Sequence, residues 1–163
     1  MDEKQICCPE FNPKPWNETE HIWNDKLFIM DTIPQFLHMP LPSMFGKTVT
    51  KMWQTIEKSG ANPALKDFLM LAHDPSPWKS ELYIHITQEV PGANNVKLSG
   101  TFLTKVYDGP FNEMRNFIKD FERYVSDKGK VINKLYFYYT YCPKCALKYG
   151  HNYIVAFAAL KWV

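Results

Sequence analysis

Hydrophobic and polar residues follow two different periods along the chain after residue 32. Apolar residues spaced by three and four positions begin at Phe45 and again at Phe111, and the two runs stop at Gly60 and Gly129. This spacing predicts two amphipathic helices that end near those glycines. The flanking segments are rich in apolar, β-branched and aromatic residues, which favours strands. Strands are expected at residues 33–39, 66–72, 81–88, 100–107, 131–141 and 152–162.

The expected elements occur in the same order twice. Residues 33–98 and residues 99–163 each give strand, helix, strand, strand, and Phe36-Leu37 and Phe102-Leu103 hold equivalent places. This pattern predicts an α+β fold in which duplicated strand-helix-strand-strand modules form an antiparallel sheet with two helices on one face. The other face then needs a cover, which could be the N-terminal segment, a ligand or a partner.

Residues 1–32 show neither period and contain closely spaced prolines, as in Asn12-Pro13-Lys14-Pro15-Trp16. Proline fixes φ and removes a hydrogen-bond donor, so we expect an extended arm here. Its large apolar side chains favour packing on the body, because exposed aromatic strings promote aggregation. A sharper alternative is that Trp16 or Trp23 forms a wall of a ligand pocket. The expected organisation is an arm at 1–32 and a single domain at 33–163.

The chain has 163 residues and is 45% hydrophobic, which is enough for a sizeable core without a metal or a disulfide. Its net charge is only +2 and the basic residues are scattered, so direct nucleic-acid binding is not expected. No apolar run approaches membrane-spanning length, and the first residues lead into no apolar stretch. We therefore expect a cytoplasmic protein with no membrane contact, as a monomer or a homodimer.

Aromatic residues make up 15% of the chain and indicate where a ligand could bind. Strand alternation puts Tyr136 and Tyr138 on one face, and likewise Glu81, Tyr83 and His85. If the helices cover the aliphatic face, this second face lines an aromatic cleft between the modules and binds a small apolar or aromatic molecule. Alternatively, these tyrosines are half-exposed under the arm. The expected ligand-binding residues are Trp53, Trp78, Tyr83, Tyr136, Tyr138 and Tyr153.

Glu81 and His85 are the candidate catalytic residues. They point to the same face of one predicted strand, close enough to act on one molecule. A carboxylate among aromatic side chains can protonate a leaving group or activate water. The competing interpretation is that Glu81 is a solvated residue at a strand start and His85 a surface residue.

The four cysteines allow several kinds of chemistry. Cys142 and Cys145 lie in an expected hairpin loop at a spacing that can place both sulfurs on one metal ion. A structural zinc would need more ligands, which Cys8 with either Cys7 or His151 could supply. A redox pair usually opens a helix after a strand, whereas this pair is expected between strands. Reduced thiols packed against the arm are the third alternative.

Residues 103–114, Leu103-Thr104-Lys105-Val106-Tyr107-Asp108-Gly109-Pro110-Phe111-Asn112-Glu113-Met114, resemble the GyrI-like family. In that family a strand ends in a hydrophobic-x-Gly-Pro-aromatic turn, and an amphipathic helix follows. The resemblance extends over residues 33–163 and implies two strand-helix-strand-strand modules. The family includes small-molecule-binding domains of multidrug-responsive regulators, a gyrase inhibitor, and hydrolases acting on cyclopropane-bearing genotoxins.

The chain is also similar to stand-alone members of that family, which carry an N-terminal Cys-Cys-Pro and a Cys-Pro-x-Cys before the last strand. This resemblance implies a single ligand-binding domain without a DNA-binding domain. Family pockets often hold a carboxylate at the start of the last strand, where this chain has His151-Asn152-Tyr153; Glu81 holds the equivalent place in the first module. We expect binding of a xenobiotic-like small molecule. The alternatives are a hydrolase of reactive xenobiotics using a pocket carboxylate, and a protein-interaction module.

Overall fold

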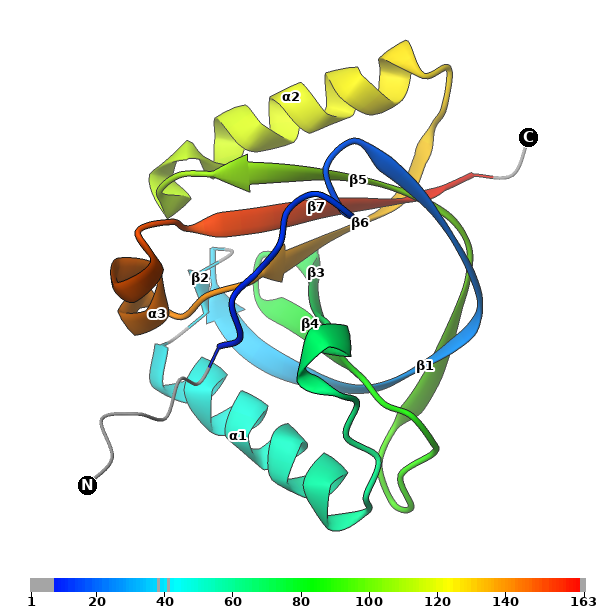
Figure 1. The fold of residues 1–163 in the computed structure, drawn as a ribbon, viewed down its shortest axis with the longest axis vertical. Helices are drawn as coiled ribbons and strands as arrows, with labels where there is room; N and C mark the ends of the chain where they lie inside the picture. The colour runs from blue at the N-terminus through cyan, green and yellow to red at the C-terminus, as the bar shows by residue number, and fades with distance from the viewer. Residues whose placement is uncertain (1–7, 38, 41, 162–163) are drawn as a thin grey trace. The chain divides into compact units, whose positions relative to one another are not determined.

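The computed structural model describes residues 8–37, 39–40 and 42–161 and divides into two compact units (Figure 1). Unit 1 combines the described residues up to Ile22 with those from Gly100 onward, and unit 2 is Trp23–Ser99. Both units contain helices and antiparallel strands, which confirms the predicted α+β class. None of the helices in the described part of the chain is long and apolar enough to cross a membrane.

Unit 2 is built on a sheet in which strands β2, β1, β4 and β3 are neighbours in that order. Phe28 of β1 lies opposite His85 of β4, and His73 of β3 lies opposite Glu81. Helix α1 buries Met52 and Ile56, one helical turn apart, as its apolar spacing predicted. Strand β1 (Thr19–Phe36) begins in unit 1 and lies mostly in unit 2. The other elements of unit 2 are β2 (Met39–Pro40), α1 (Pro42–Lys58), the 3-10 helix η1 (Leu65–Asp67), β3 (Met70–Ser76) and β4 (Lys79–His85).

Unit 1 has a three-stranded core in which β7 lies between β6 and β5. Helix α2 packs Phe121 and Val125 against Leu103 of β5 and against Ala156 and Ala158 of β7. These residues share one sheet face, since strand side chains alternate between faces. Strand β5 (Asn95–Asp108) begins in unit 2 and lies mostly in unit 1. The other elements of unit 1 are the 3-10 helix η2 (Phe111–Glu113), α2 (Met114–Asp127), β6 (Ile132–Tyr139), α3 (Pro143–Tyr149) and β7 (Tyr153–Leu160).

The opposite face of the unit 1 sheet is covered by the N-terminal segment. The Trp16 ring lies 5.5 Å from the ring of Phe157, and Phe11 makes an edge contact with Tyr138 at 6.0 Å. The Thr104 hydroxyl, fully buried on this face, donates to the Trp16 carbonyl at 2.6 Å. It accepts from His21 Nε2, 3.1 Å away. Aromatic packing and a small polar network therefore bind this segment to the sheet.

Residues 19–32 differ from the prediction, which placed them in an arm without strand structure. They form most of β1, an 18-residue strand. Asp25 has a positive φ of 52°, and the strand's alternation of buried and exposed residues breaks around it. A residue in the left-handed region interrupts the period of two from which a strand is predicted.

Two further elements also differ. The strand expected at 66–72 begins later, because Leu65–Asp67 forms η1 and β3 starts at Met70. The expected hairpin loop at 142–151 contains helix α3. Pro143 stands at the start of α3, and Gly150 follows its end with a φ of 73°. Both are positional signals for a short helix, although α3 is too brief to show a hydrophobic period.

Candidate functional site

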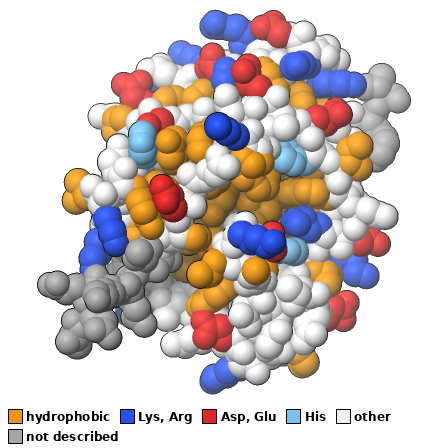
Figure 2. Space-filling view, viewed as in Figure 1, with side chains coloured by type: hydrophobic (Ala, Val, Ile, Leu, Met, Phe, Trp, Pro, Cys, Tyr) orange, Lys and Arg blue, Asp and Glu red, His pale blue; other side chains and the backbone are white. Residues whose placement is uncertain are grey.

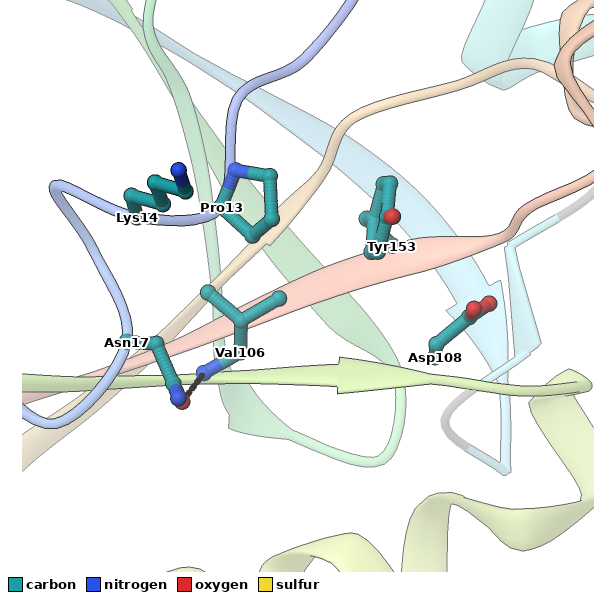
Figure 3. Close-up of a pocket in the computed structure, with 6 residues that line it drawn as sticks. All are labelled: Pro13, Lys14, Asn17, Val106, Asp108 and Tyr153. Carbon is teal, nitrogen blue, oxygen red and sulfur yellow. Dashed lines mark hydrogen bonds between the residues drawn. The ribbon is translucent and has the colours of Figure 1, made fainter.

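A cavity of about 270 Å³ opens on unit 1 (Figure 3). The N-terminal segment contributes Pro13, Lys14 and Asn17, and the Asn17 side chain accepts the backbone N–H of Val106 at 3.2 Å. This bond fixes the segment against β5, so the wall and the sheet form one structure. The lining residues are Pro13, Lys14, Asn17, Val106, Asp108 and Tyr153.

Asp108 provides the carboxylate of this cavity. Its side chain accepts from His151 Nδ1 at 2.7 Å and from the backbone N–H of Asn152 at 2.9 Å. Partial desolvation raises the pKa of Asp108, but these two hydrogen bonds and the nearby His151 outweigh it and hold the pKa below its usual value. Asp108 is therefore ionised at neutral pH.

Asp108 was not among the residues predicted for the site, because the sequence prediction considered a carboxylate only at the start of the last strand. Asp108 ends β5 and pairs with Tyr153, the first residue of β7. The neighbouring strand thus supplies a carboxylate beside the place where His151-Asn152-Tyr153 has none. Only the antiparallel pairing of β5 with β7 places Asp108 next to Tyr153, and a single sequence does not specify that pairing.

Tyr153 is the aromatic surface of the cavity. Its ring stacks on His151 at 4.8 Å and lies 5.6 Å from Phe11 and 6.1 Å from Tyr141. The other two tyrosines expected to bind ligand in this unit, Tyr136 and Tyr138, are only 2% and 4% exposed. Burial raises the pKa of Tyr138. Of the predicted binding residues in unit 1, Tyr153 lines the cavity.

Unit 2 holds the predicted catalytic residues on one face of β4. The Tyr83 hydroxyl donates to Glu81 Oε1 at 2.9 Å, so the side chains two residues apart do meet. Phe28 of β1 contacts both Tyr83, at 6.4 Å, and His85, at 5.6 Å between ring centroids. Glu81, Tyr83, Phe28 and His85 therefore form one continuous aromatic and polar row.

The surroundings of His85 fix its tautomer. Nδ1 lies 2.9 Å from the Leu27 carbonyl oxygen, which can only accept, so Nδ1 carries the proton and Nε2 the lone pair. Desolvation lowers the pKa of His85, outweighing the Leu27 hydrogen bond, which raises it. A neutral imidazole with a defined basic nitrogen is the form that a general base requires.

The two tryptophans expected to bind ligand lie elsewhere in unit 2. Trp53 of α1 makes an edge contact with Phe68 at 5.5 Å. Trp78, in the β3–β4 turn, is 56% exposed and contacts Phe36 at 5.5 Å. Each therefore has an aromatic neighbour within its own unit, with Trp78 at an open surface.

Three of the cysteines come together in unit 1. The sulfur atoms of Cys8, Cys142 and Cys145 all lie within 4.8 Å of one another, a set that could hold a metal ion. Cys7, the fourth cysteine, lies outside the described residues. His151, the alternative ligand considered from the sequence, is engaged by Asp108 instead.

The local structure around these thiols corrects one argument from the sequence. Cys142-Pro143-Lys144-Cys145 was expected between strands, a setting unlike that of redox pairs. Cys142 instead immediately precedes α3, which follows β6, so the motif does open a helix after a strand. The expectation failed because α3 was taken for a loop.

Charged side chains are mixed on the visible face of the molecule. Figure 2 shows lysine and arginine interspersed with aspartate and glutamate, without a continuous basic surface on that face. This distribution differs from the clustered basic face that phosphate backbones require.

The fold is that of GyrI-like proteins. The C-terminal domain of EcmrR matches with a TM-score of 0.67 over 91% of this chain and 99% of that domain, at 13% identity. A hydrolase from Listeria innocua matches with a TM-score of 0.62 over 88% of this chain and 91% of that chain, also at 13% identity. An EcmrR–DNA complex matches over 89% of this chain but 56% of the EcmrR chain, with a TM-score of 0.64 and 13% identity.

The sequence itself gives a narrower assignment. Residues 1–160 match the family described as bacterial hydrolase, and the chain belongs to that family. A search of curated proteins gave no match. The GyrI-like resemblance is therefore confirmed at the level of the fold, while the family is a different one by description.

Proposed function

We propose that this chain binds a small, largely aromatic molecule that carries a polar or cationic group. The observation that carries the proposal is the unit 1 cavity, where the Tyr153 ring lies beside the Asp108 carboxylate. Aromatic surface with a few fixed polar groups is the usual composition of small-molecule sites.

The cavity sets the size and charge of the ligand. Its volume of about 270 Å³ is just below the range of drug-sized pockets, so one or two fused rings fit it. Asp108 is held ionised by His151 and Asn152 and attracts a cationic group. Lys14, on the opposite wall, favours a ligand whose positive charge is confined to the Asp108 side. Flat aromatic amines combine these properties.

The test compares pairs of flat aromatic compounds that differ only in charge, using calorimetric titration of the full chain. Asp108→Asn should weaken binding of the cationic member and leave its neutral isostere nearly unchanged. Tyr153→Leu should weaken both members. Glu122→Gln, at an exposed carboxylate on α2 of the same unit, is the matched control and should change neither. Equal loss of both members in Asp108→Asn, or binding indifferent to Tyr153→Leu, would contradict the proposal.

Hydrolysis is the second candidate function, and the Glu81–Tyr83 hydrogen bond favours it. A carboxylate positioned by a tyrosine, with the neutral His85 on the same strand face, can activate water for attack on a strained or activated electrophile. The family description points in the same direction.

Turnover separates the two functions. In a hydrolase, Glu81→Gln and His85→Gln should lower kcat against activated esters or strained rings while substrate affinity is kept. Asp108→Asn serves as the opposite control, because it alters the unit 1 cavity and should leave that turnover intact. Turnover that is absent from the wild type, or unaffected by both substitutions, would rule out this use of Glu81 and His85.

A further inference from the structure

The cluster of Cys8, Cys142 and Cys145 has no part in the proposed ligand site. It joins the beginning of the described chain to helix α3, within unit 1. The three sulfur atoms lie within 4.8 Å of one another, and Cys145 is 3% exposed. A single buried cysteine can be explained as ordinary core packing, whereas three sulfur atoms this close together indicate a shared chemical role.

Local structure presents two of the sulfurs together. Cys142 has extended backbone angles, φ −71° and ψ 163°, immediately before α3, and Cys145 lies in the first turn of that helix. The residue before a helix and the third residue within it direct their side chains toward the same end of the helix. The three-residue separation of Cys142 and Cys145 therefore brings both sulfurs to the same end of α3.

Cys8 is brought to the same point by two hydrogen bonds. The Tyr149 hydroxyl donates to the Cys8 carbonyl at 3.1 Å, and the Cys142 backbone N–H donates to Cys8 Sγ at 3.3 Å. A hydrogen bond donated to sulfur stabilises the thiolate over the thiol, because it is strongest when the acceptor is charged. Thiolate is also the form that binds metal.

We propose that Cys8, Cys142 and Cys145 bind one zinc ion as thiolates. Two thiolates on a tetrahedral zinc, each at about 2.3 Å from the ion, lie about 3.8 Å apart. The sulfurs lie within 4.8 Å of one another, so each pair needs to close by at most about 1 Å to reach that separation. Binding replaces the thiol protons with the metal and leaves one tetrahedral position for a fourth ligand. The ion fastens the N-terminal segment to α3.

A disulfide is the competing use of these residues, and its consequences are different. Any single disulfide would join two of the three sulfurs and leave the third as a thiol, whereas zinc uses all three. No disulfide joins any two of the three in this structure. A zinc site therefore predicts a loss of binding on removal of any one of them.

The primary experiment titrates zinc into the full chain after reduction and chelator treatment. We expect one zinc per chain, a rise in Tm, and release of about three protons per zinc when the heat is compared across buffers of different ionisation enthalpy. Co²⁺ in place of zinc should give sulfur-to-metal charge-transfer absorption. A disulfide between two of these cysteines that persists in the presence of the reductant, or no zinc binding by the fully reduced chain, would overturn the proposal.

Variants identify the ligands. Cys8→Ala, Cys142→Ala and Cys145→Ala should each lose stoichiometric zinc and the Co²⁺ absorption. Cys8→Ala is the most informative, because Cys8 is outside the helices and strands and its loss should preserve the circular dichroism of the chain. His151→Gln, which removes the alternative ligand, is the matched control and should retain zinc. Retention in Cys8→Ala with intact circular dichroism, or loss in His151→Gln, would contradict the three-thiol assignment.

Discussion

Thr104 is a fully buried polar residue on β5, between the apolar Phe102 and Val106 of the same strand face. Its hydroxyl donates to the Trp16 carbonyl and accepts from His21 Nε2, so one residue satisfies two polar groups of the N-terminal segment. At the scale of single residues, this hydroxyl helps to attach the segment, because leaving its buried polar partners unsatisfied would be costly.

Replacing Thr104 with valine keeps the side-chain shape and removes the hydroxyl. We expect Thr104→Val to lower the free energy of unfolding by about 1–3 kcal/mol, because the Trp16 carbonyl and His21 each lose their hydrogen bond to the hydroxyl. Urea unfolding measures this change. Thr101→Val, on the same strand at a half-buried position, is the control and should be close to neutral. Equal effects of the two substitutions would show that the hydroxyl network adds nothing.

His85 gives the molecule a pH dependence of a definite sign. Desolvation by burial lowers its pKa below the ordinary 6.5, with Lys26 adding to this effect and Asp67 opposing it. Between the folded pKa and 6.5, the unfolded chain binds more protons than the folded chain. The contribution of His85 to stability is therefore present above pH 6.5 and decreases as the pH falls toward the folded pKa.

A proton NMR titration should place the His85 midpoint below 6.5. Urea unfolding across the same pH range gives the free energy of unfolding of the wild type and of His85→Gln. Just below pH 6.5 this free energy should fall less steeply with decreasing pH in the variant than in the wild type. A His85 midpoint above 6.5, or parallel slopes, would show that the imidazole is not desolvated in solution.

At the scale of elements, the turn between β5 and α2 depends on one glycine. A Cβ added at Gly109 would lie 2.9 Å from Cζ of Phe117, whose ring stacks on Tyr107 at 4.9 Å. Any larger residue at this position has to displace the Phe117 ring, which gives a physical reason for glycine in this turn.

Two glycine-to-alanine substitutions test this reading. Gly109→Ala should cost about 1–3 kcal/mol, because the added methyl group displaces Phe117 from its stack. Gly46→Ala, on an exposed position of α1 with no atom within 4 Å of the new Cβ, should instead stabilise by about 0.5–1 kcal/mol. Urea unfolding gives both values, and a neutral Gly109→Ala would mean that the Phe117 ring moves aside freely.

At the scale of the whole molecule, the hydrophobic period predicted the two long helices, whose apolar residues recur at regular helical spacing. Gly60 and Gly129 both have positive φ just beyond the helices that they were expected to end. Phe121 and Val125 face the sheet as their spacing predicted. The irregular backbone at Asp25 was not predicted, because a positive φ at a residue other than glycine cannot be recognised from the hydrophobic pattern.

The candidate sites were less predictable because they rest on contacts between distant segments. Cys8 meets Cys142 across 134 positions of sequence, and Asp108 meets His151 across 43. Residue types and local spacing identified the thiols, Tyr153 and the Glu81–His85 strand, whereas the register that adds Asp108 requires the folded sheet. The duplication of modules, the cytoplasmic location, the absence of nucleic-acid binding and the oligomeric state stay predictions.

Unit 2 is one uninterrupted stretch of chain, whereas unit 1 is assembled from both ends of the sequence. During synthesis, Phe11 and Trp16 leave the ribosome long before the residues that they cover, Tyr138 and Phe157. The aromatic side chains of residues 8–22 therefore stay uncovered until Tyr138 and Phe157 have been made, and such exposed apolar surface is what chaperones bind. Refolding of the full chain should show the same order for a different reason, because contacts within residues 23–99 span less sequence than those of residues 8–22. In pulsed hydrogen exchange, amides of residues 23–99 should gain protection before those of residues 8–22.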